Sequence, residues 1–338
     1  MSNSGKILTL VVPSYNMDRY LSVCLDSVTA DCISDALEVI VVNDGSVDST
    51  LEIAREYEAR RPDIVTVIDK DNGNYGSCVN VGLAQATGKY FRILDADDYA
   101  DTTALADFMS RLQNCEADLV VSLIVEDIYK NDRKIDERHY SFDAVRKNHI
   151  YKADEFYIHT HVFSSEFRMH GMTYKTSVLK KSGLRLLEGI CYTDNIYLFQ
   201  PFAYISTFVV YDLYLYHYRM GRDGQTMDLA RQKKNLRDIT LVVDFILHEF
   251  ELTPQDEHLK TNQKALLNES LGLFIGILKM QKSVPCELYE HLHYIIMMIN
   301  KYGISHRELR RKWYFRLWKL TESSRVLSLV LGINGLVK

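Results

Sequence analysis

The stretch LEVIVVND, residues Leu37 to Asp44, decides the fold. It is a continuous and largely β-branched apolar run without polar alternation, which is typical of a strand covered on both faces. A similar run, ILTLVVP, lies upstream at Ile7 to Pro13. Between the two runs, Asp18 to Val28 carries apolar residues at helical spacing. The chain therefore begins with a strand, a helix and a second strand.

The same alternation continues further along the chain. A second helix is predicted over Ser49 to Arg60 and a third strand over Ile64 to Ile68. A third helix, over about Tyr75 to Ala86, precedes a fourth strand in KYFRIL, Lys89 to Leu94. Strands that alternate with helices predict an α/β fold: a mostly parallel, Rossmann-like sheet with right-handed crossovers and helices on both faces.

The composition is that of an ordinary globular protein. Of 338 residues, 47% are hydrophobic and 25% are charged. Six scattered cysteines form no CxxC pair, which favours reduced thiols in a reducing compartment. The N-terminus lacks the pattern of a signal peptide, and no stretch reaches the roughly 20 apolar residues that a membrane span needs. We therefore expect a cytoplasmic protein.

Polar residues follow each predicted strand at the point where the strand ends. These groups are Pro13 to Asn16, Asn43 to Ser46, Asp69 to Asn74 and Asp95 to Asp98. In open parallel sheets, ligands bind beyond the carboxyl ends of the strands, so we expect the four groups to converge on one edge. No GxGxxG or GxxxxGK[ST] pattern is present, which disfavours a dinucleotide fold of the usual type and a P-loop.

The last of these groups holds three carboxylates in four positions, Asp95, Asp97 and Asp98. Carboxylates so close together raise one another's pKa unless a cation lies between them. Their hard oxygen ligands suit Mg²⁺ or Mn²⁺. The alternative is that Asp98 or Asp101 caps a helix starting near Thr102, while the other carboxylates are solvated turn formers.

A second D-x-D string, Asp69 and Asp71, also follows an apolar run, so the pattern alone is weak. Here Lys70 lies inside the pair and can neutralise it without a metal ion.

Asp44 has two interpretations. It could simply end a strand before a glycine turn, with Ser46 or Asp48 capping the next helix. It could also accept a hydrogen bond from a ring N–H of a nucleobase. Neighbouring motifs are needed to decide between the two.

The combination of LEVIVVNDGSVDST, DNGNYGSCVNVGLAQATGKYFRILDADD and, much later, YTDNIYLF resembles family 2 glycosyltransferases, inverting enzymes of the GT-A type. The resemblance covers roughly Ile7 to Met227. It implies that Pro13, Tyr15 and Asp44 line the base and ribose of a nucleotide. It also implies a Mn²⁺ or Mg²⁺ site, with Asp97 as the direct ligand and Asp95 holding ribose or a metal-bound water.

The same resemblance supplies a catalytic base, which must take the proton of the attacking acceptor hydroxyl. The family usually has Glu-Asp where this chain has Thr193-Asp194, so the base role comes to Asp194. The departure at Thr193 removes a second acidic group. The alternative role for Asp194 is the N-cap of a helix over Asn195 to Tyr204.

LYLYHYRMGRDGQTM, Leu213 to Met227, is an alternating strand followed by a basic loop, and it resembles the closing segment of members that build bacterial cell-surface polysaccharides. Arg219, Arg222 and Gln225 could contact the diphosphate, or the loop could be solvated. The Q-x-x-R-W of processive members is absent, which favours transfer of a single sugar.

Two histidines, His161 and His170, lie where the resemblance expects an acceptor-side loop. They could contact the acceptor or a phosphate. A surface or packing role is the alternative.

We expect a catalytic domain over residues 1–227, with 1–98 binding the nucleotide sugar and 99–227 forming the acceptor side, and a helical region over 228–338. Residues 306–338 carry eight basic residues against two acidic ones, interleaved with aromatic residues. This tail could lie peripherally on the inner face of the plasma membrane or complete a helix bundle. The otherwise acidic chain disfavours nucleic acid as a partner.

The predicted function is transfer of one sugar from a nucleotide-diphospho sugar, with a UDP-sugar favoured, to a saccharide or lipid-linked saccharide. One alternative is a sugar-phosphate nucleotidyltransferase, which would carry a glycine-rich basic loop after the first strand. A second alternative is a catalytically inactive, glycosyltransferase-like binding subunit. The formation of a homodimer remains open.

Overall fold

The computed structural model describes residues 5–142, 145–152, 155, 168–221, 232–254, 256–281 and 284–304. The chain divides into two compact units, residues 1–222 and 223–338. The boundary predicted from the sequence, between residues 227 and 228, falls outside the described residues.

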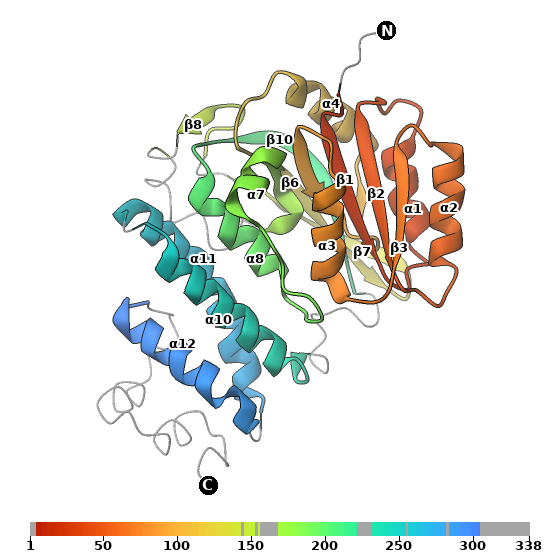
Figure 1. The fold of residues 1–338 in the computed structure, drawn as a ribbon. Helices are drawn as coiled ribbons and strands as arrows, with labels where there is room; N and C mark the ends of the chain where they lie inside the picture. Colours follow the sequence, from red (N-terminus) through yellow and green to blue (C-terminus); the bar gives the residue numbers. More distant parts are fainter. Residues whose placement is uncertain are drawn as a thin grey trace. The chain divides into compact units, whose positions relative to one another are not determined.

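The first part of unit 1 alternates strictly between strand and helix. Its elements are β1 (Leu8–Ser14), α1 (Leu21–Thr29), β2 (Leu37–Asp44), α2 (Thr50–Arg60), β3 (Val65–Lys70), α3 (Asn74–Gln85) and β4 (Tyr90–Ile93). The four strands lie in the order β3-β2-β1-β4, and every neighbouring pair is parallel. All four carboxyl ends therefore meet at one edge of the sheet (Figure 1).

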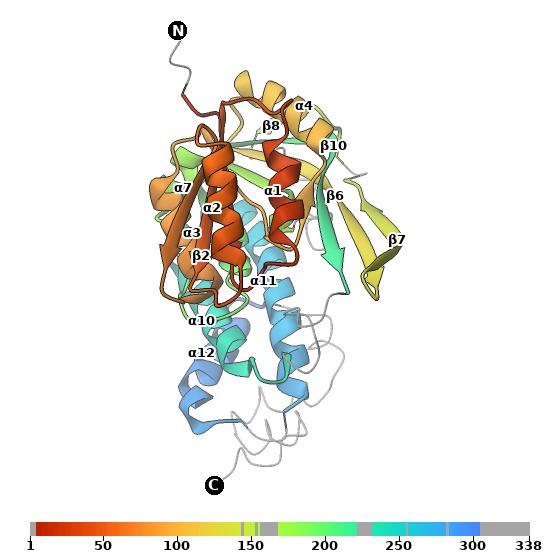
Figure 2. The same ribbon diagram turned by 90° about the vertical axis from the view of Figure 1, so that its right-hand side faces the viewer.

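The second part of unit 1 extends the sheet in a mixed pattern. Its strands are β5 (Tyr99–Ala100), β6 (Leu119–Lys130), β7 (Arg133–Tyr140), β8 (Ile150–Lys152), β9 (Met172–Lys175) and β10 (Thr207–Met220). Strand β9 runs antiparallel between β4 and β6, whereas β10 runs parallel to β6. Strands β6 and β7 form a hairpin flanked by β10 (Figure 2). The helical elements are α4 (Thr102–Gln113), η2 (Met169–Gly171), α7 (Thr176–Ser182), α8 (Asp194–Phe199) and η3 (Gln200–Tyr204).

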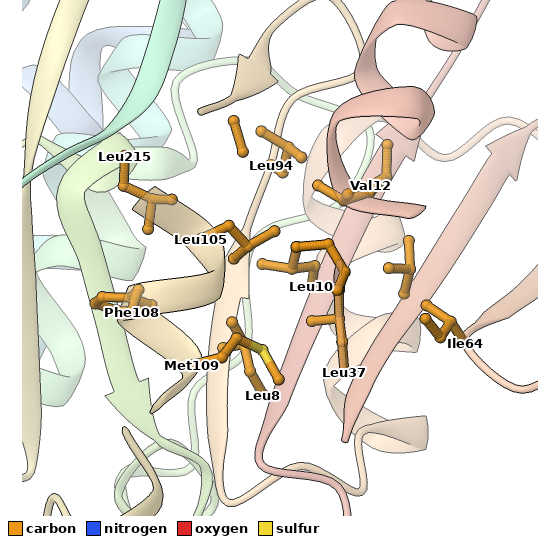
Figure 3. Packing of buried hydrophobic residues seen from close by; sticks show 14 of the residues in the cluster. Leu8, Leu10, Val12, Leu37, Ile64, Leu94, Leu105, Phe108, Met109 and Leu215 are labelled. Atoms are coloured by element: carbon orange, nitrogen blue, oxygen red, sulfur yellow. The ribbon is translucent and has the colours of Figure 1, made fainter. Parts of the chain in front are cut away.

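The two faces of the sheet are both covered, as the continuous apolar runs predict. Leu8, Leu10 and Val12 on alternate positions of β1 belong to one core with residues of α1 and α4, including Leu105 (Figure 3). Val11 points to the opposite face, where a Cβ added to Gly82 of α3 would lie 2.5 Å from its Cγ1. Truncating a core leucine such as Leu10 to alanine would cost about 2–5 kcal/mol. The α/β fold predicted from the sequence is confirmed.

Unit 2 is helical, with α10 (Leu236–Leu252), α11 (Glu257–Lys279), η4 (Cys286–Leu288) and α12 (Tyr289–Lys301). An apolar stripe at helical spacing lies buried on α10: Leu236, Ile239, Val243, Ile246, Leu247 and Phe250. Helix α10 packs against both α11 and α12. Within the described parts of the chain, no helix has the length and apolar character required to cross a membrane. The basic, aromatic tail at 306–338 lies outside the described residues.

Candidate active site at the carboxyl ends of the strands

The loops that follow β1 and β2 are joined to each other. Asn16 donates its backbone N–H to Ser46 Oγ at 3.0 Å, and its own Oδ1 accepts the backbone N–H of Val47 at 2.9 Å. Asn16 adopts a positive φ of 53°, a left-handed conformation that asparagine tolerates better than most residues. Next to this junction, Pro13 is buried and Tyr15 is 47% exposed. The expected convergence of the first two groups is confirmed.

Asp44 is buried at the end of β2 and is well supplied with donors. Its Oδ1 accepts from Lys70 Nζ at 2.6 Å and from the backbone N–H of Gly73 at 2.9 Å. The side chain of Asp44 is only 3% exposed. The expectation that Lys70 neutralises Asp69 and Asp71 is wrong, because the described ion pair of Lys70 is with Asp44. Strand β3 is adjacent to β2, which brings this ammonium group to Asp44.

The structure shows which residues cap α2 and α4, the two helices for which alternative capping residues were predicted. Asp101 Oδ1 accepts the backbone N–H of Ala104 at 2.7 Å, so Asp101 caps α4 and Asp98 does not. The N-cap of α2 is Ser49, so neither Ser46 nor Asp48 holds that position, although Asp48 Oδ1 accepts the backbone N–H of Thr50 at 3.0 Å. Neither cap uses a residue predicted to bind the nucleotide or the metal ion.

The turn from Asp95 to Asp98 is held against β10 by two residues of that strand. Tyr216 Oη donates to Asp98 Oδ2 at 2.6 Å and accepts the backbone N–H of Asp95 at 3.2 Å. Arg219 donates its backbone N–H to Asp98 Oδ1 at 2.7 Å and its Nε–H to the backbone oxygen of Asp97 at 3.2 Å. Asp98 is 1% exposed, and burial, followed by the charges of Asp97 and Asp95, raises its pKa well above the usual range. Asp98 therefore anchors the turn.

Arg219 was predicted as a diphosphate contact. Its guanidinium lies over two rings, 4.1 Å from the centroid of Tyr129 and 5.4 Å from that of Tyr20. Together with its bonds to the turn, this arrangement supports a role in holding Asp97 and Asp98 in place. A contact with the diphosphate remains a prediction.

Asp95 faces two side chains from distant parts of unit 1. Tyr75 Oη donates to Asp95 Oδ1 at 2.9 Å, and His170 Nε2 lies 3.6 Å from Asp95 Oδ2. Asp95, Asp98 and His170 each offer a ligand atom, and these atoms lie within 4.8 Å of one another. Asp97 is not in this group, although its charge raises the pKa of Asp98. Its role as a metal ligand stays a prediction.

Asp194 is the first residue of α8. The N-cap position belongs to Thr193, whose side chain makes no capping bond, so the predicted N-cap role of Asp194 is wrong. The preceding Tyr192 has a φ of +65°, a strained conformation for a bulky residue. Burial raises the pKa of Asp194; the charge of Asp95 raises it further, whereas His170 lowers it. Asp194 therefore lies within electrostatic reach of Asp95 and His170.

Several site residues are not marked by any pattern in the sequence, and others that were predicted lie outside the described residues. Tyr75 and Tyr216 contact Asp95 from 20 and 121 positions away, so no local pattern marks them. The alternation of LYLYHYRM predicts that alternate aromatic residues of β10 share a face, but not what that face meets. The predicted diphosphate contacts Arg222 and Gln225, and the histidine His161, lie outside the described residues.

Comparisons with known proteins bear on the family and the fold of this chain. The model of the family described as Glycosyl transferase family 2 matches residues 9–174. Uncharacterized glycosyltransferase EpsJ of Bacillus subtilis is 33% identical over 114 residues, which is 34% of this chain and 33% of that protein. The aligned part thus spans about a third of this relative's length.

Solved structures share the fold. The structure of S. aureus TarS 1-349 in complex with UDP-GlcNAc aligns with a TM-score of 0.60 at 19% identity, covering 88% of this chain and 80% of that one. The mannosyltransferase PcManGT from Pyrobaculum calidifontis, in complex with GDP-Man and Mn²⁺, aligns with a TM-score of 0.50 at 16% identity, covering 89% and 83%. The chain thus has a GT-A type fold, and its residues 9–174 match the model of glycosyltransferase family 2.

Proposed function

We propose that this protein transfers a single sugar, with inversion, from a nucleotide-diphospho sugar to a saccharide or lipid-linked saccharide in surface polysaccharide synthesis. The observation that carries the proposal is the cluster of Asp95, Asp98 and His170, whose possible ligand atoms lie within 4.8 Å of one another. Asp194, whose pKa is raised by burial, lies within electrostatic reach of Asp95. A carboxylate with a raised pKa beside a cluster of other carboxylates is a common arrangement in active sites. The tail at 306–338 is rich in basic and aromatic residues, and we propose that it binds peripherally to the inner face of the plasma membrane.

The donor is proposed to bind at the edge formed by β1 and β2. Asp44 accepts hydrogen bonds there, which suits the ring N–H of uracil or guanine, and Pro13 and Tyr15 lie at the end of the adjacent strand. The TarS structure with UDP-GlcNAc and the PcManGT structure with GDP-Man support a nucleotide sugar. We favour UDP because TarS, which shares the fold, is bound to UDP-GlcNAc in one solved structure and to UDP in another.

The turn at Asp95 to Asp98 fits a divalent cation. Burial, followed by the charges of Asp97 and Asp95, raises the pKa of Asp98, and an ion among hard oxygen ligands relieves the repulsion between the carboxylates. Asp95 and Asp97 would hold it. A bound Mn²⁺ or Mg²⁺ would supply positive charge where negative charge develops on the departing diphosphate.

Asp194 is proposed to accept the proton of the acceptor hydroxyl. The hydroxyl oxygen then forms a bond to the anomeric carbon while the bond from that carbon to the diphosphate oxygen breaks, which inverts the configuration. Because burial raises the pKa of Asp194, its carboxylate is a stronger base than an exposed aspartate. Tyr75 and Tyr216 hold Asp95 in place.

The test begins with thermal unfolding in UDP, GDP, CDP and dTDP, each with and without Mn²⁺. A ligand that binds only the folded form raises the unfolding temperature by mass action. We expect the largest rise in unfolding temperature with UDP and Mn²⁺. Asp97→Asn should lose this rise. The matched control Asp107→Asn, on the exposed side of α4, should keep it. Hydrolysis of the matching nucleotide sugar should follow the same pattern.

Two results would contradict the proposal. If no nucleotide stabilises the protein with or without Mn²⁺, the donor site is wrong. If a nucleotide binds but neither hydrolysis nor transfer of its sugar is detected, the protein is a binding subunit, which the absence of a carboxylate at Thr193 would then explain.

A further inference from the structure

We propose that His170 is a ligand of the divalent ion at the Asp95–Asp98 turn and that it makes the site prefer Mn²⁺ to Mg²⁺. This inference rests on the proposed function, because it concerns the ion that the proposed function requires. It adds a ligand from η2, a part of the chain about 70 residues beyond the D-x-D string.

The distance between the two side chains is the first argument. His170 Nε2 and Asp95 Oδ2 are 3.6 Å apart, which is too long for a hydrogen bond. Two ligands bound at about 2.1 Å to one ion lie between about 3.0 Å apart when adjacent at right angles and about 4.2 Å apart when opposite. The observed separation falls inside this interval, so one ion can contact both atoms without moving them.

The hydrogen bonds around Asp95 and His170 also determine which of their atoms can bind an ion. Tyr75 donates to Asp95 Oδ1, which leaves Oδ2 as the oxygen on the His170 side. His170 Nδ1 is buried and has no hydrogen-bond partner among the described residues. The ring can therefore reach a ligand only through Nε2, the atom that already faces Asp95.

Asp98, the third member of this group, is less suited to be a ligand. Both of its oxygens accept hydrogen bonds, one from Tyr216 and one from the backbone of Arg219, and the residue is 1% exposed. An ion bound to Asp98 would have to compete with these donors inside the protein. His170, whose side chain is 15% exposed, can meet an ion without losing a described bond.

His170 is also held rigidly. The buried guanidinium of Arg92 on β4 donates to the backbone oxygen of His170, and to Ser122 Oγ and Thr173 Oγ1 at 3.0 Å each. The imidazole ring packs against Tyr216 and Tyr218, with ring centroids 5.0 and 4.5 Å away. Arg92 is thus a positioning residue that ties η2 to the strand leading to Asp95.

The chemistry of the donor atom determines which ion is preferred. Mg²⁺ is bound almost entirely through oxygen, whereas imidazole nitrogen is a normal ligand for first-row transition metals. A site with one imidazole and neighbouring carboxylates should therefore bind Mn²⁺ more tightly than Mg²⁺. Removing the imidazole should remove that preference.

The experiment measures metal binding directly, without turnover. Free Mn²⁺ is titrated by electron paramagnetic resonance in the presence of UDP, and Mg²⁺ is added as a competitor. We expect His170→Ala to weaken Mn²⁺ binding about tenfold or more, with a much smaller change for Mg²⁺. Electron spin-echo modulation of bound Mn²⁺ should show nitrogen coupling in the wild type that His170→Ala abolishes. His139→Ala, at an exposed histidine of β7, is the matched control and should behave as wild type.

The outcomes separate this inference from the proposed function. If Asp97→Asn loses Mn²⁺ but His170→Ala keeps it with unchanged affinity and nitrogen coupling, the inference is wrong and the proposed function stands. If the wild type binds no Mn²⁺ with UDP, both fail. A second variant, His170→Gln, keeps a polar side chain of similar size and tests whether the loss of nitrogen coupling comes from misfolding. If circular dichroism shows that His170→Gln is folded, its bound Mn²⁺ should still lack the nitrogen coupling.

Discussion

Two carboxylates of the candidate site, the buried Asp44 and the half-buried Asp194, have opposite surroundings. Asp44 accepts from an ammonium group and a backbone N–H on one oxygen. Asp194 receives a bond from the side chain of Asn195 at 3.2 Å and, among the described residues, has no ion pair with lysine or arginine. Burial raises its pKa. The difference suggests that Asp44 is built to remain an acceptor for a ligand, whereas Asp194 is prepared to take up a proton.

The largest effect is expected for Asp194→Asn, which removes the proposed base. The rate of sugar transfer should fall by about 10²–10⁴-fold, measured as initial velocity with saturating donor. The wild-type rate should increase as the pH rises through the pKa of Asp194 in the folded protein, because the base must be ionised. A variant rate within a few fold of wild type would contradict the role of Asp194.

The same substitution should not destabilise the fold. An acid whose pKa is raised by folding contributes stability at low pH that is lost as the pH rises through the folded pKa. Asparagine does not ionise, so it avoids this loss. The unfolding temperature of Asp194→Asn at neutral pH should therefore equal or exceed that of wild type, and its advantage should shrink in acid.

Changing the surroundings of Asp44 should, by contrast, destabilise the fold. Lys70→Met leaves that buried carboxylate without its cation, which should cost about 3 kcal/mol of unfolding free energy in urea and weaken nucleotide binding. The matched control is Lys134→Met, because Lys134 pairs with the equally buried Asp127 on the β6–β7 hairpin. The control should lose stability but keep nucleotide affinity. Equal nucleotide affinity in both variants would show that Asp44 does not serve the donor.

A smaller effect is expected for Tyr216→Phe. The change removes the hydroxyl that joins Asp98 to the backbone of Asp95, at a cost of about 1–2 kcal/mol of unfolding free energy. Because the turn loses an anchor, Mn²⁺ affinity should fall as well, as measured by calorimetric titration. Normal affinity together with lower stability would limit Tyr216 to a structural role.

The smallest effect is expected for Arg19→Ala. Arg19 pairs with Asp132 at 2.9 Å, joining the loop after β1 to the tip of the β6–β7 hairpin, but the two side chains are 65% and 72% exposed. Exposed pairs contribute about 0–1 kcal/mol. Unfolding free energy and nucleotide affinity should both stay near wild type. A large loss of either would mean that the hairpin tip takes part in the site.

The sequence predicts the first part of unit 1 well because its signals are local. Leu37–Asp44 reads as a buried strand from its own residues, and β2 has those bounds. The edge where ligands bind then follows from the parallel order of β1 to β4. In the same way, Asp101 was recognised as a possible cap from its position alone.

The other half of the site depends on contacts that a single sequence does not encode locally. His170 approaches Asp95 because β9 inserts antiparallel between β4 and β6, which no apolar run reveals. Lys70 lies beside Asp69 and Asp71 in sequence, yet pairs with Asp44 on the neighbouring strand β2. Asp98 was a candidate helix cap from its position in sequence, and only the structure shows that it is buried and accepts hydrogen bonds from Tyr216 and Arg219.

The central claim is that the turn at Asp95 to Asp98 binds a divalent ion and a nucleoside diphosphate beside Asp194. The most direct test is a crystal soaked with MnCl₂ and UDP, with anomalous differences recorded at a wavelength where manganese scatters. The account predicts one manganese peak within coordination distance of Asp95 or Asp97 and of the UDP phosphates. A crystal that contains UDP but shows no peak at this turn, or a peak bound elsewhere, would contradict it.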